Sequence, residues 1–261
     1  MFYSFGCSYT YGAGLYYHKW LRNKTDGYQI PNRHDSWVEH RDLLSSTDHE
    51  FRLKNRFVGL LSKELNMSYY GAEEVGGDNT QIIDTSFRQI ETIRTIHQDK
   101  VVDRKVEFML VQLSHPRRDY KEPTFKELKE WSKYKDFDEH YNEHLDGMVE
   151  RLDELKKECD KINVKLYVFS MEDCVGVKLI NKSYCIPIYV DGIEYNSIEH
   201  LKKERNSKVI NNNKIWTMGK NINVPIFVCD ELYKFGITDT HLGLNGNKIV
   251  KDSIIRKMQE K

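Results

Sequence analysis

The N-terminal stretch MFYSFGCSYTYGAG, residues 1–14, decides the fold that we expect for this chain. Its apolar start ends at Gly6, Cys7 and Ser8, which is typical of a buried strand that stops at a small polar residue. Ser8 is therefore predicted to follow the carboxyl end of a central strand, where open parallel α/β sheets place their chemistry. A serine there is a candidate nucleophile, and a helix-capping serine is the other interpretation.

Apolar patterns along the rest of the chain predict strands that alternate with helices. Further strands are expected at 67–72, 106–113, 165–171 and 225–229. Helices are expected where apolar residues recur at helical spacing, at 57–65, from about 80 to 93, at 141–162, and from residue 245 or 246 to 258. Strands that alternate with helices indicate an α/β protein with a parallel sheet of five strands.

Two segments interrupt this alternation. Residues 15–56 are polar and aromatic and are longer than an ordinary connection, so they form either a lid beside the site or a cover for the sheet edge. Residues 172–224 contain a predicted hairpin around Asp191-Gly192 and a charged helix from Ser197 to about Arg205. A single domain over residues 1–261 with these two insertions is the simplest organisation for this length.

Composition argues against several classes of function. The 40 basic and 40 acidic residues cancel, so no overall field attracts nucleic acid or an anionic membrane. No apolar run is long enough to span a membrane and no secretion signal is recognisable, so we expect a cytoplasmic, soluble chain. No glycine motif for nucleotide binding follows the first strand. The five scattered cysteines lack zinc-ligand spacing, so we expect reduced thiols, no metal and no cofactor.

Polar residues that follow the predicted strands are expected to meet at one edge of the sheet. They are Ser8 after the first strand, GGDNT (76–80) after the second, Ser114 and His115 after the third, and Asp239 and His241 after the last. Right-handed crossovers bring the carboxyl ends of parallel strands to the same side. Serine, histidine and aspartate are the parts of an acyl-transfer site, in which histidine takes the hydroxyl proton and aspartate fixes its tautomer.

Three of these segments resemble sequence blocks of the SGNH, or GDSL-type, hydrolase superfamily of esterases and lipases. FGCSYTYG (5–12) is similar to the first block, with Ser8 as the nucleophile. GGDNT is similar to the second block, which implies that the amide of Gly77 contributes to an oxyanion hole. DTHLGLNGNKIV (239–250) is similar to the last block, which implies Asp239 and His241 as the remaining catalytic residues. The resemblance implies a three-layer α/β/α, flavodoxin-like fold.

The chain departs from the family pattern in its third block. That block usually supplies an Asn from a Gly-x-Asn-Asp turn, whereas Ser114 and His115 stand at this place, so we keep both as candidates for oxyanion or substrate binding. Asn79 is either a replacement amide donor or a helix cap.

Two further departures concern the proposed catalytic residues. Asp239 lies two residues before His241 instead of the usual three, so it either orients the imidazole directly or tunes it from a distance. Cys7 stands where the family has an Asp, and it is either a packing residue or an alternative nucleophile.

The expected function is hydrolysis of an ester of a small acyl group, with acetyl on a carbohydrate as the leading substrate. The tyrosines and tryptophans of residues 9–37, together with His115, Arg117 and Arg118, suit sugar rings, and no loop offers the apolar surface that a lipase needs. The expected partner is a small ester or acylated carbohydrate, without nucleic acid or membrane. The alternative is a catalytically silent module of the same fold that binds a glycan or a partner protein.

Overall fold

The computed structural model describes residues 1–7, 10, 12–16, 45–73, 77–98, 105–114, 116, 119, 137–205, 226–227 and 241–260. Contacts within the chain divide it into two compact units. The first unit consists of Met1–Cys7, Ser68–Pro187 and Asn196–His200. The second consists of Ser8–Met67, Ile188–Tyr195 and Leu201–Lys261.

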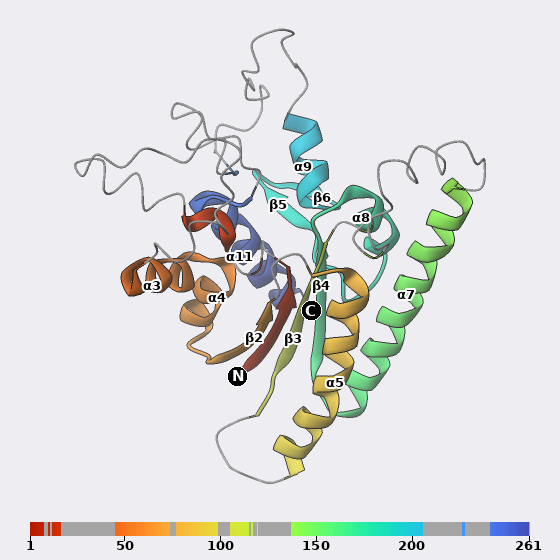
Figure 1. The fold of residues 1–261 in the computed structure, drawn as a ribbon, viewed down its shortest axis with the longest axis horizontal. Helices are drawn as coiled ribbons and strands as arrows, with labels where there is room; N and C mark the ends of the chain where they lie inside the picture. The colour runs from red at the N-terminus through yellow and green to blue at the C-terminus, as the bar shows by residue number, and fades with distance from the viewer. Residues whose placement is uncertain are drawn as a thin grey trace, which may run out of the picture. The chain divides into compact units, whose positions relative to one another are not determined.

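A parallel sheet organises the first unit (Figure 1). In the described part of the chain it has four strands: β1 (Phe2–Gly6), β2 (Tyr69–Glu73), β3 (Phe108–Leu113) and β4 (Lys165–Ser170). Their spatial order is β2-β1-β3-β4. Every residue of β1 and β3 is buried, as expected for strands covered on both faces. The predicted α/β class and the first four predicted strands are confirmed.

The fifth predicted strand, 225–229, lies mostly outside the described residues. Only Ile226 and Phe227 of this segment are described, and Phe227 forms an isolated antiparallel bridge with Leu242. A sheet of five strands is therefore not established by the described residues.

Two long helices lie side by side along the sheet of the first unit (Figure 1). They are α5 (Asn79–Gln98) and α7 (Phe137–Lys161), both expected from the apolar spacing. Their buried stripes include Ile83 and Ile93 on α5 and Leu152 and Leu155 on α7. A short helix, α8 (Asp173–Leu179), follows β4 and was not foreseen.

The second unit contains several short elements and one longer helix, α11 (Leu244–Gln259). The short elements are η1 (Ala13–Tyr16), α3 (Ser46–Asn55), α4 (Phe57–Leu65), β5 (Ile188–Val190) and β6 (Ile193–Tyr195). Helix α11 contacts α4 and β5, and α9 (Ile198–Arg205) begins in the first unit and ends in the second.

The predicted hairpin and charged helix of residues 172–224 are confirmed. Strands β5 and β6 pair antiparallel around Asp191 and Gly192, whose φ angles are 51° and 83°. Two positive φ values are what a two-residue type I′ turn requires.

The predicted lid is only partly described. Residues 17–44 lie outside the described residues, and α3 occupies the end of this segment. No helix in the described ranges has both the length and the apolar character needed to cross a membrane.

Gly246 allows α11 to approach the backbone of residue 226. A Cβ at this position would lie 2.2 Å from the carbonyl oxygen of Ile226 and 3.0 Å from Cδ2 of Leu242. Such separations are too short for any side chain, so only glycine fits here without displacement of the neighbouring backbone.

We expect Gly246→Ala to lower the free energy of unfolding by roughly 1–3 kcal/mol, because the added methyl overlaps the Ile226 carbonyl. Gly147→Ala in α7 is the matched control, since a Cβ there meets no heavy atom within 4 Å. In that control the free energy of unfolding should rise by up to about 1 kcal/mol, because alanine has a higher helix propensity than glycine. Urea unfolding measures both, and a shift of the two midpoints in the same direction would contradict the close approach.

Candidate functional site

The strand order reverses beside β1, because β2 lies on one side of it and β3 on the other. Ligands of open parallel α/β sheets bind outside the carboxyl ends of the strands at such a point. Gly6 ends β1 and Leu113 ends β3, so the segments beginning with Cys7 and Ser114 leave the sheet there. Two of the predicted segments therefore start from neighbouring strand ends.

Cys7 ties the end of β1 to β3. Its backbone N–H donates to Oε1 of Gln112 at 3.1 Å, and its thiol lies 3.3 Å from the same oxygen. Gln112 Nε2 donates to the carbonyl of Leu113 at 2.6 Å. Both Cys7 and Gln112 are fully buried. This arrangement favours the packing interpretation of Cys7.

The side chain of Asn79 holds the residue that follows β3. Asn79 Oδ1 accepts from the Ser114 N–H at 2.6 Å, and Asn79 Nδ2 donates to the Ser114 carbonyl at 3.2 Å. Nδ2 also lies 3.2 Å from Oδ2 of Asp119. Asn79 and Ser114 are both buried, so the structure brings these two predicted site residues together. The hydrogen bonds engage both N–H groups of the carboxamide.

Asp119, in the turn that follows Pro116, contacts the same Asn79. Its Oδ1 accepts from the backbone N–H groups of Asn79 at 2.5 Å and Thr80 at 3.1 Å. Its Oδ2 lies 2.9 Å from Nε2 of His144 on α7, and its side chain is only 1% exposed. We name Asn79, Ser114, Asp119 and His144 the α5 clamp.

Asp78, rather than Asn79, is the capping residue of α5. Its Oδ1 accepts from the N–H of Gln81 at 2.7 Å, and its carbonyl accepts from the N–H of Ile82 at 3.1 Å. This is the usual geometry of an N-cap aspartate. The Asn79 carboxamide instead fixes the turn after β3.

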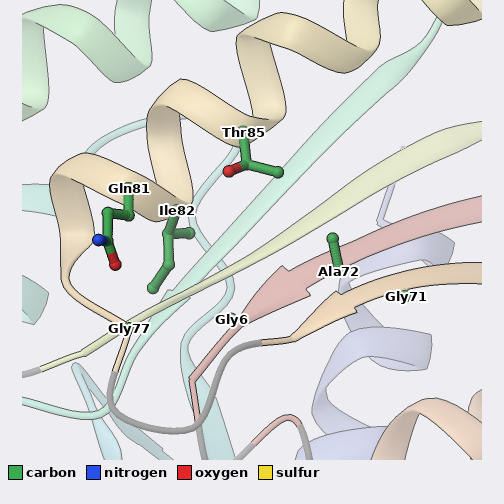
Figure 2. A pocket seen from close by; sticks show the side chains of 7 residues that line it. All are labelled: Gly6, Gly71, Ala72, Gly77, Gln81, Ile82 and Thr85. Atoms are coloured by element: carbon green, nitrogen blue, oxygen red, sulfur yellow. The ribbon is translucent and has the colours of Figure 1, made fainter.

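Gly77 is buried and lines a pocket between α5 and the carboxyl ends of β1 and β2. The pocket has a volume of about 240 Å³. Figure 2 shows Gln81, Ile82 and Thr85 of α5 on one side and Gly6, Gly71 and Ala72 on the other. We name it the α5–β2 pocket.

His241 belongs to the second unit, and the two residues that follow it are held by backbone and side-chain hydrogen bonds. Leu242 bridges to Phe227, and the Gly243 N–H donates to the carbonyl of Ile226 at 2.9 Å. Asn247, which is fully buried, donates from Nδ2 to the Leu242 and Gly243 carbonyls at 3.2 and 2.8 Å.

The same Asn247 carboxamide also fixes the start of α4. Its Oδ1 accepts from the N–H of Phe57 at 2.9 Å. Asn247 therefore joins the residues after His241 to the first residue of α4.

Three predicted site residues, Ser8, His115 and Asp239, lie outside the described residues, as do Arg117 and Arg118. Among the residues that the structure describes, no three His, Cys, Asp or Glu side chains gather in a way that could hold a metal ion.

Comparison of the chain with models of known families, with curated proteins and with solved structures gives no match.

The sequence analysis missed four polar side chains that organise these segments: Gln112, Asp119, His144 and Asn247. Gln112 was the one polar position near the end of an apolar strand, which is a readable signal for a buried polar contact. Asp119 lies in a charged stretch in which nothing distinguishes it from its neighbours.

We expect Asp119→Ala to lower the free energy of unfolding by roughly 2–4 kcal/mol. The change removes the carboxylate that accepts from the first two N–H groups of α5 and leaves the N–H of the buried Asn79 without this partner. Asp84→Ala on the same helix is the control, because Asp84 is half-exposed and forms a surface ion pair with Arg151, whose loss costs about 1 kcal/mol or less. If urea unfolding gave the two variants equal losses, the α5 clamp would not be a stabilising unit.

Proposed function

We propose that this chain is a serine esterase of the SGNH type, with Ser8 as nucleophile, His241 as base and Asp239 as the carboxylate that orients the base. The observation that carries the proposal is the position of Ser8 in the chain. It follows Gly6, the last residue of β1, by two residues, and β1 borders the point where the strand order reverses.

The topology of the sheet supports this proposal. The order β2-β1-β3-β4 corresponds to the first four strands of the flavodoxin-like order 2-1-3-4-5. In the proposed three-layer fold, residues 225–229 supply the fifth strand. Asp239 and His241 would then follow the last strand of the sheet, as Ser8 follows the first.

The proposed reaction is acyl transfer in two steps. Ser8 Oγ attacks the ester carbonyl carbon while His241 takes the hydroxyl proton, and the oxyanion accepts a hydrogen bond from the Gly77 N–H. The alcohol leaves with the proton that His241 returns to it. Water then attacks the acyl-enzyme with His241 again as base, which releases the acid and restores Ser8.

The proposed substrate carries a small acyl group, acetyl in the simplest case, on a carbohydrate. The support for a small group is the limited volume of the α5–β2 pocket, which lies below the roughly 300–1,000 Å³ of sites for drug-sized ligands. The support for a carbohydrate is the set of aromatic and basic residues in 9–37 and 115–118.

We expect Ser8→Ala and His241→Ala each to lower kcat for p-nitrophenyl acetate by about a thousandfold or more. The double variant should be little worse than either single variant, because the two groups act as one unit. Cys7→Ser is the control beside the nucleophile and should keep most of the activity. Activity that persists in Ser8→Ala but disappears in Cys7→Ser would identify Cys7 as the nucleophile and contradict the assignment of Ser8.

We expect the wild-type chain to release acetate from O-acetylated oligosaccharides, and Ser8→Ala to release none. Acetate release over time measures this directly. An activity that rises steadily towards long acyl chains, with none on acetylated sugars, would reject the carbohydrate substrate. Saturable binding of a glycan without any turnover would favour the catalytically silent module.

A further inference from the structure

We propose that the α5–β2 pocket binds the acyl group of the ester and accepts unbranched acyl chains of about two to six carbons. The inference rests on the proposed function, because it takes Gly77 as an oxyanion donor and Ser8 as the nucleophile. It adds the place of the acyl group, its size limit and a residue that sets this limit.

The volume of the pocket gives the upper size. An engineered apolar cavity of about 150 Å³ in another protein holds benzene, a ring of six carbons. The α5–β2 pocket, at about 240 Å³, can therefore hold a chain of similar carbon number. An acetyl group fits and leaves most of this space unfilled.

Small residues create the space. Gly6, Gly71 and Gly77 contribute only backbone to the wall, and Ala72 contributes one methyl group. Figure 2 shows the Ala72 methyl pointing towards α5, where Thr85 faces it. A larger side chain at residue 72 would project into the pocket, so Ala72 sets its width.

The remaining wall suits a short chain. Ile82 is nearly buried and offers an apolar surface, whereas the exposed Gln81 brings a polar side chain to the wall. Thr85 Oγ1 already accepts from Nη2 of Arg88 at 2.8 Å. Each methylene of the acyl chain that is buried against Ile82 and Ala72 should raise the affinity for the ester by about fourfold, up to the size limit of the pocket.

The chemistry of the wall assigns the pocket to the acyl side of the ester. The leaving alcohol has to face the base that protonates it, whereas the acyl chain needs no proton. None of the described lining residues is titratable. Gly77, the proposed oxyanion donor, lies in the same wall, so a chain in the pocket extends from the reacting carbonyl carbon.

The first test is kinetic, with p-nitrophenyl acetate, butanoate, hexanoate and decanoate. In the wild type we expect kcat/KM to rise from acetate to butanoate or hexanoate and to fall at decanoate. Ala72→Val should lower the butanoate-to-acetate ratio by about tenfold, since one methylene changes discrimination in a pocket by that order. Gly147→Val adds similar bulk to open space on α7 and should leave the ratio unchanged.

The second test measures binding without turnover. Ala13 and Ala72 are the two alanines of the chain, so ¹³C-methyl alanine labelling gives two methyl signals. In a Ser8→Gly background, which removes the hydroxyl without adding an alanine, ethyl butanoate should shift the Ala72 signal in a saturable way and move the signal of the buried Ala13 much less. The loss of one signal in Ala72→Val assigns the pair.

The outcomes distinguish a failure of the acyl-pocket proposal from a failure of the esterase proposal. A saturable Ala72 shift with no hydrolysis by the wild type would overturn the esterase and keep the acyl-binding pocket. Hydrolysis together with an unmoved Ala72 signal would overturn the pocket and keep the esterase. Hydrolysis with an unchanged chain-length preference in a folded Ala72→Val variant would overturn the pocket as well.

Discussion

The two hydrogen bonds between the Asn79 carboxamide and the backbone of Ser114 are the constraint on which the candidate site depends. They fix the first residue after β3 to the first residue of α5. Because both partners are buried, water cannot replace these bonds when the turn moves, so the geometry is rigid. Asp119 accepts two further hydrogen bonds from Asn79 and one from the Thr80 N–H, and its other contact, with His144, links this turn to α7.

Much of the fold was predictable because short-range sequence patterns within each element indicate its secondary structure. The strands β1 and β3 are nearly continuous in apolar residues, and α5 and α7 show helical spacing over many turns. Helix α8 has only seven residues, too few for a periodic signal. Helix α3 did offer a signal, since Ser45 and Asp48 form a capping box, but the surrounding polar stretch concealed it.

The candidate site was less predictable because its contacts join residues far apart in the chain. Asn79 was expected either to cap α5 or to donate to an oxyanion, yet its partner is the backbone of residue 114, which no local pattern encodes. Asn247 likewise lies inside a predicted helix, and its bond to Phe57 spans two segments. Propensity describes such residues as weak helix formers and says nothing about their partners.

The start of α5 also limits how an oxyanion could be held. The N–H groups of Asn79, Thr80 and Gln81 all donate to the carboxylates of Asp119 or Asp78. These carboxylates neutralise the positive end of the helix dipole, so the dipole offers little help to a second anion. The Asn79 carboxamide has both N–H groups engaged as well. Acyl transfer at this edge would therefore depend on backbone donors that precede the helix, Gly77 first among them.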